Sequence, residues 1–174
     1  MRASLGITET NFSLAYSFAT IVSGAMLPFV GRMIDRRGAR SMLPAIAFLL
    51  GMACVGMSYV SGLRSLYFGF SFVRSLGQGA LTLVAAWLVG EWFARRRGFA
   101  TAASGLGGSL SVMCIPLLNL YFISRFDWQT GWIVLAVCVW GMLFVPSVFL
   151  VRDRPEDLGW LPDGDGFVGE EPLL

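Results

Sequence analysis

The sequence has no histidine and no lysine, and charged residues make up only 14% of its 174 positions. Soluble domains carry about 25% charged residues, so this composition argues against a soluble globular protein. Without histidine, the chain cannot form a His/Cys zinc site or a histidine-based catalytic relay. The three cysteines lie in three different apolar stretches, which favours a packing role over a metal site or a disulfide; they are Cys54, Cys114 and Cys138. We therefore expect no metal and no other cofactor.

The residues that are present indicate a membrane protein. Hydrophobic residues make up 56% of the chain, and all 13 basic residues are arginines. The net charge of only +2 gives no reason to expect a nucleic-acid partner, because membrane topology accounts for the arginines. The first residues do not resemble a signal peptide, since no small-residue cleavage pattern follows a short apolar core. We expect the lipid bilayer to be the partner of this hydrophobic chain.

Five apolar stretches are long enough to cross a bilayer, which takes about 20 residues each. The sequence thus predicts an all-α membrane protein with a bundle over residues 1–151 and a polar tail or linker over residues 152–174. The predicted transmembrane helices cover residues 10–31, 41–60, 65–90, 98–123 and 130–151.

The turns between these stretches predict the orientation. The segment Gly31–Arg40 holds four arginines and Asp35, so it must lie at a membrane face. Nine arginines follow the first, third and fifth stretches, and only three lie on the opposite side. Because positive residues accumulate in cytoplasmic loops, we expect the N-terminus outside and the C-terminal tail in the cytoplasm, in the plasma (inner) membrane.

Arg74 is the only arginine inside an apolar stretch, about 13 Å from its outer end at 1.5 Å per residue. A charge at this depth is a candidate functional residue. Polar residues spaced three or four apart accompany it, which predicts one polar stripe on the helix; they are Tyr67, Ser71, Gln78 and Thr82. Arg74 could bind a carboxylate with two hydrogen bonds or govern a nearby proton site. Alternatively, its role is structural, with the side chain reaching the headgroups or backbone carbonyls.

Polar residues on two other stretches are weaker candidates for lining a substrate cavity. They are Tyr16 and Thr20 on the first stretch and Asn119 on the fourth. For each of them, hydrogen bonds between helices are the favoured alternative. The fourth stretch also carries small residues along one face, which predicts a surface where another helix packs closely; these are Ala100, Ser104, Gly108 and Ser111.

Three segments resemble the major facilitator superfamily of secondary transporters. Gly31–Arg40 resembles its loop between the second and third helices. Trp92–Ala100, followed by Gly105 and Gly108, resembles the loop and fifth helix of the monocarboxylate and oxalate–formate branch. Arg152–Gly164 is similar to the segment that comes after the sixth helix in that branch. The resemblance implies helices two to six of an N-terminal half, without the first helix or the second half.

The resemblance also implies a role for the charged turn, here called the switch loop (residues 31–40). In the family, this cluster latches the outward-open state, and Glu91 is the nearest further partner. The residues concerned are Gly31, Asp35, Arg36, Gly38, Arg40 and Glu91. The alternative is that these charges only set the topology. The family's fourth-helix signature fits less well, since Gln78 stands one position later than in that signature.

The function implied is secondary transport of a small organic anion, similar to a monocarboxylate, with proton coupling as one option. We expect it only in a full-length transporter, with the missing half or a second copy as partner. The alternative is a truncated membrane protein without transport activity, or a half-molecule that needs a partner chain. An enzyme is not expected, because the five stretches contain no histidine and no acid.

Overall fold

A computed structural model describes residues 8–164, and within this range the chain is helical without any β-strand. In residues 8–164, five helical stretches are long and apolar enough to cross a membrane, which confirms the predicted all-α membrane fold. They are Glu9–Arg37, Ala39–Ser58, Leu63–Trp92, Arg97–Arg125 and Trp128–Leu150.

Two of the five stretches are interrupted by π-helical turns, in which the hydrogen bonds run from residue i to i+5. The continuous helices are α1 (Glu9–Arg37), α2 (Ala39–Ser58) and α5 (Arg97–Arg125). The third stretch consists of α3 (Leu63–Arg74), the π-helix η1 (Ser75–Leu81) and α4 (Thr82–Trp92). The fifth consists of α6 (Trp128–Val139), the π-helix η2 (Trp140–Phe144) and α7 (Val145–Leu150). Two short 3₁₀ turns come next, η3 (Pro155–Leu158) and η4 (Pro162–Gly164).

The switch loop is far shorter than the sequence suggested. α1 begins where predicted, with Thr8 as its N-cap, but it continues through the arginines to Arg37. Arginine is a good helix former, and its side chain reaches water from the end of a helix, so the charges do not stop α1. Only Gly38 interrupts the helices: its φ is 74°, and its N–H donates to the carbonyl of Ile34 at 2.8 Å. The expected loop over residues 32–40 was therefore wrong in extent.

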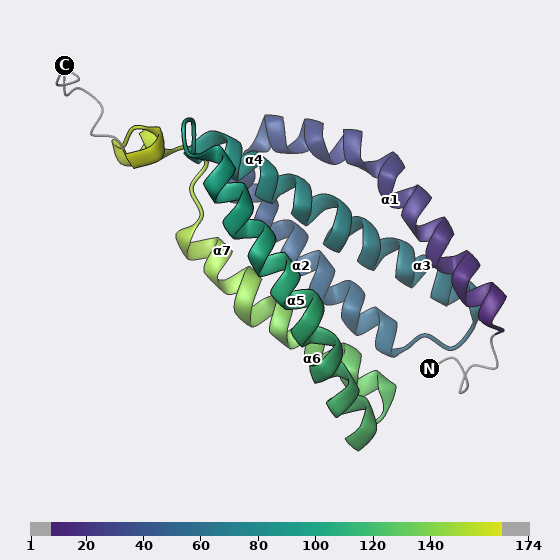
Figure 1. Cartoon of the computed structure of the whole chain (residues 1–174). Coiled ribbons are helices and arrows are strands. Elements are labelled where there is room, and N and C mark those ends of the chain that lie inside the picture. Colours follow the sequence, from purple (N-terminus) through teal and green to yellow (C-terminus); the bar gives the residue numbers. More distant parts are fainter. Residues whose placement is uncertain (1–7, 165–174) are drawn as a thin grey trace, which may run out of the picture.

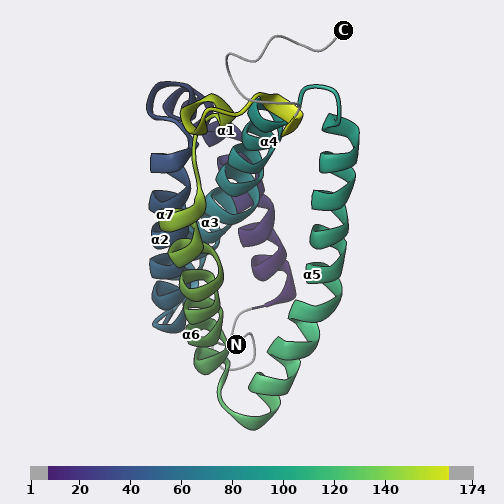
Figure 2. The same cartoon turned by 90° about the vertical axis from the view of Figure 1, so that its left-hand side faces the viewer.

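The bundle has its core around α2. In the apolar part of α2, 44% of the residues are buried, whereas in α5 none are. Buried side chains from α1, α2, η1 and α4 form one cluster; they are Ile34, Ala39, Met42, Ile46, Ala80 and Val84. Cys54 of α2 packs with Leu50 and with Ala136 of α6, as expected of a packing cysteine. Figure 2 shows α5 standing at one edge of the bundle.

The connections between the helices lie alternately at the two ends of the bundle (Figures 1 and 2). One end carries the α1–α2 corner, the α4–α5 turn and the segment after α7. We call it the basic end, because nine of the arginines lie in these connections or in the helix ends beside them. The opposite end carries the α2–α3 and α5–α6 turns. This alternation is what successive antiparallel spans require.

Candidate functional site

Arg74 lies at the end of α3, where its side chain is only partly buried. Its guanidinium carbon is 3.9 Å from the centre of the Tyr16 ring on α1. At this distance the cation is attracted by the electron-rich face of the ring, and the attraction is strongest where water is excluded. The structure therefore brings together two residues that were predicted independently, from two different helices.

A close contact between α1 and η1 fixes this arrangement. The hydroxyl of Ser23 donates to the carbonyl oxygen of Arg74 at 3.4 Å. A Cβ atom at Gly79 would lie 2.8 Å from the Ser23 hydroxyl oxygen, so glycine is needed for the two helices to approach this closely. Ser23 was not among the predicted site residues. Its position, seven residues after Tyr16 and therefore on the same face of α1, was the available signal.

The expected polar stripe does not continue as one α-helical face. Ser71 donates to the Tyr67 carbonyl at 2.7 Å on the α3 side, but the π-helix begins directly after Arg74. A turn closed from i to i+5 changes the angle between successive side chains, so the α-helical spacing from which the stripe was predicted does not hold between Ser75 and Leu81. Within residues 8–164, no hydrogen bond joins the Gln78 side chain to Arg74, and Gln78 is exposed. The assumption of continuous α-helical spacing was wrong.

Two of the three weaker cavity candidates, Thr20 and Asn119, have contacts close by. The Thr20 hydroxyl donates to the Tyr16 carbonyl at 2.9 Å, within α1. Asn119 of α5 lies against α6, where its side-chain oxygen would be 2.8 Å from a Cβ atom at Gly131. Thr20 thus bonds within its own helix, and Asn119 packs between two helices.

The switch-loop residues are not gathered into one ion-pair cluster in this conformation. Asp35 is exposed in the last turns of α1, and in the part of the chain described here no ion pair joins it to an arginine. Glu91 instead pairs with Arg154, with 3.7 Å between its Oε2 and the arginine Nε. Gly31 comes close to α4, since a Cβ atom there would be 3.7 Å from a Leu83 methyl. Arg36 is exposed.

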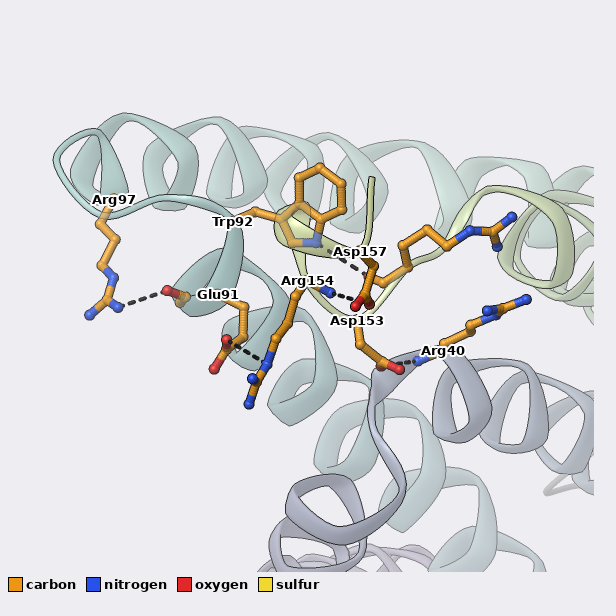
Figure 3. Close-up of polar contacts among 9 residues, drawn as sticks. Arg40, Glu91, Trp92, Arg97, Asp153, Arg154 and Asp157 are labelled. Atoms are coloured by element: carbon orange, nitrogen blue, oxygen red, sulfur yellow. Dashed lines mark hydrogen bonds and ion pairs between the residues drawn. The ribbon is translucent and has the colours of Figure 1, made fainter. Parts of the chain in front are cut away.

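The acidic partner of the switch loop comes from the segment after α7. The Asp153 carboxylate accepts the backbone N–H of Arg40 at 2.8 Å (Figure 3). A Cβ atom at Gly38 would be 2.4 Å from the Asp153 carboxylate oxygen Oδ1, so both the positive φ and this approach require glycine. Asp153 was not predicted, because its partner stands 113 residues earlier in the chain.

Comparison with known proteins identifies relatives of this chain. The mouse protein monocarboxylate transporter 14 is 28% identical over 167 residues, which is 93% of this chain and 31% of that protein. Human monocarboxylate transporter 6 is 28% identical over 146 residues, covering 81% of this chain and 29% of its own length. Human monocarboxylate transporter 2 is 24% identical over 147 residues, which is 78% of this chain and 31% of that protein. The chain thus spans about a third of the length of these relatives.

A family model also matches this chain. The model of the Major Facilitator Superfamily matches residues 1–165. This match covers all five membrane-spanning stretches, the switch loop and the segment after α7. The chain is therefore membrane-embedded, and it belongs to the major facilitator superfamily.

Proposed function

We propose that this chain is part of a secondary transporter that carries a small organic anion of the monocarboxylate type. The observation that carries the proposal is the Arg74 guanidinium, placed within a membrane-spanning stretch over the ring of Tyr16. The relatives named above are monocarboxylate transporters, which supports an anionic substrate.

The chemistry of Arg74 suits this role. Its guanidinium has donors on a rigid planar fork, which match the two oxygens of a carboxylate. The Arg74 guanidinium lies over the Tyr16 ring, and a cation–π contact of this kind does not use up its N–H donors. In the described part of the chain, no carboxylate forms an ion pair with Arg74, so the anion that neutralises it in our proposal is the substrate. Alternatively, in a proton-coupled transporter, the charge of Arg74 would govern a nearby proton site.

The proposal concerns a full-length transporter. Alternating access needs two halves that rock around a site near the middle of the membrane. This chain supplies five of the spans, and the partner in our proposal is the remaining part of the transporter or a second copy of this chain. We expect the 174-residue chain alone not to accumulate substrate in proteoliposomes.

The central test replaces Arg74 in the full-length protein. Losing a buried charged hydrogen-bonded pair costs about 2–5 kcal/mol, so Arg74→Gln should weaken anion binding more than tenfold at roughly 1.4 kcal/mol per decade. Arg74→Lys should recover only part of this loss, because an ammonium lacks the planar fork. Tyr16→Phe should retain most of the affinity, because the ring face remains.

A matched control is available in the same chain. Arg125 also lies over a tyrosine ring, that of Tyr121 at 5.7 Å, but at the end of α5. Arg125→Gln removes the same charge from the same kind of contact and should leave binding unchanged. Unaltered binding and transport in Arg74→Gln at normal expression would leave only a structural role for Arg74.

The proposed orientation, with the basic end in the cytoplasm, has its own test. Ser41 is exposed near the start of α2 at the basic end. In a variant without the three native cysteines, Ser41→Cys should react with a membrane-impermeant maleimide only after the membrane is opened. Labelling of Ser41→Cys in intact cells would reverse the orientation.

A further inference from the structure

The segment after α7 does not leave the bundle but crosses its basic end. The sequence suggested only a tail or a linker here. In the structure, residues 152–164 contact α2, α4 and the turn before α5. Two aspartates placed ten positions apart, Asp153 and Asp163, make the contacts at its two ends.

The first contact is at the start of α2. The first N–H groups of a helix have no partner within the helix, and a carboxylate there is also favoured by the helix dipole. Asp153 supplies this carboxylate by accepting the N–H of Arg40 at 2.8 Å. Gly38, which has no side chain, leaves room for it. This end of the segment therefore sits on the switch loop itself.

The second contact is with the last turn of α4. The indole N–H of Trp92 donates to the carbonyl oxygen of Arg152 at 3.3 Å, and Arg154 pairs with Glu91 (Figure 3). Arg97 continues the connection to α5, because its guanidinium donates to the carbonyls of Gly90 at 2.7 Å and Phe93 at 2.9 Å. The α4–α5 corner is thus held from both sides.

The third contact is at the start of α5. The Asp163 carboxylate accepts three successive backbone N–H groups: Ala94 at 3.0 Å, Arg95 at 2.6 Å and Arg96 at 3.1 Å. Successive N–H groups of this kind form a concave anion-binding site. Asp163 itself has a φ of 64°, a conformation that aspartate adopts more readily than most residues. Both the backbone and the side chain at this position serve the contact.

Among the helices that the strap contacts, α5 depends most on this contact for its position. None of the residues in its apolar part is buried, so packing within residues 8–164 does little to hold it. We propose that residues 152–164 form a strap that joins the switch loop, α4 and the start of α5 into one unit, which moves as a whole when the transporter changes state. Only the motion rests on the proposed function; the joining itself is independent of transport.

Two measurements on the full-length protein test the joining. The first is limited trypsin digestion in detergent, with cleavage after Arg95 and Arg96 detected by mass spectrometry. The second is the distance distribution between spin labels at Ser41→Cys and Phe99→Cys, both exposed positions, in a variant without the native cysteines. The test variants are Asp163→Gly, which keeps the positive φ accessible but removes the carboxylate, and Asp163→Asn, which keeps an acceptor oxygen.

Asp163→Gly should speed cleavage about tenfold, the change that a shift of about 1.4 kcal/mol in local opening gives. Asp163→Asn should lie between this variant and the native protein. Cleavage after Arg64, at the opposite end, serves as the internal reference. The control Glu156→Ala removes an exposed acid of the strap that makes neither contact, and should change nothing.

The spin-label distance distinguishes a strap from two separate caps. Asp163→Gly and Asp153→Ala should each broaden the distribution, and the double variant should be no broader than the broader single variant, because a tether fails when either end is released. An unchanged distribution in Asp163→Gly, or a broadening that adds up in the double variant, would overturn the proposal. Neither readout depends on a substrate, so a failed transport assay would not affect this test.

Discussion

α2 and α5 are similarly apolar helices rich in small residues, yet they differ in how much of each is buried. Almost half of the apolar part of α2 is buried, and none of that of α5. At Gly51 of α2, a Cβ atom would lie 2.0 Å from the indole nitrogen of Trp140, whereas Gly105, Gly107 and Gly108 of α5 have no neighbour within 4 Å. A glycine in a membrane helix therefore marks a close approach only where a partner actually packs against it.

The two helices are also held differently. Trp140 crosses to α2, donates its indole N–H to the Phe48 carbonyl at 3.3 Å and stacks on the Phe48 ring. α5 instead has Asn119 against Gly131 of α6 towards one end, and at the other end Asp163 of the strap accepts the N–H groups that precede the helix. Side-chain packing along the length positions α2, whereas the hydrogen bonds of Asp163 are made at one end of α5.

The largest effect is expected at Gly51. Gly51→Leu places a large side chain where the Trp140 indole now lies, and such overpacking costs about 1–3 kcal/mol. The melting temperature of the purified full-length protein should fall accordingly. Gly56→Leu is the matched control on the same helix, because nothing lies within 4 Å of that position. Equal stability of the two variants would show that Trp140 does not pack against α2 in the membrane.

A smaller effect is expected on the open face of α5. The small-residue stripe of this helix predicts close packing of another helix, and nothing in the described part of the chain covers Gly108. We expect Gly108→Leu to destabilise the full-length protein by about 1 kcal/mol, with Gly108→Ala nearly neutral, because added volume is penalised where helices pack closely. If both variants melt like the native protein, the face contacts lipid, and the contrast between α2 and α5 also holds in the full-length protein.

The smallest effect is a pH dependence at the start of α5. The backbone N–H of Arg95 is the main cause that lowers the pKa of Asp163 below 3.8; partial burial opposes it, and the N–H groups of Arg96 and Ala94 and the charge of Arg96 add to it. Since the pKa is lower in the folded state, the contact is complete above about pH 4 and is lost as the pH falls through the lowered value.

The measurement for this pH effect is the mobility of a spin label at Phe99→Cys. The mobility should be constant from pH 7 down to about 4 and should rise only in more acidic solution. Asp163→Asn, which cannot titrate, should show no such rise. A rise of the same size in both proteins would assign it to general acid unfolding instead.

The features that could be predicted from the sequence are those that depend on residue type and on neighbours in the chain. The five apolar stretches and their arginine-rich turns follow from the cost of placing charges in hydrocarbon, which depends only on residue type and run length. Arg74 could be singled out for the same reason. The helix start at Thr8 was also predictable, because a cap involves neighbours in the chain. The resemblance to the superfamily rested on motifs of this local kind.

The tertiary structure decided whatever joins distant parts of the chain. The placement of Arg74 over Tyr16 depends on α1 packing against η1, which needs Gly79 and Ser23 to meet. The π-helix after Arg74 is a choice between hydrogen-bond patterns that differ little in energy, so packing selects it and residue spacing does not. In the sequence, Asp153 and Asp163 are not distinguishable from other acids of a polar tail. Their partners, Arg40 and the N–H groups of residues 94–96, lie far earlier in the chain. Composition and spacing determine which segments enter the membrane, whereas contacts between segments determine which polar groups meet at the site and at the basic end.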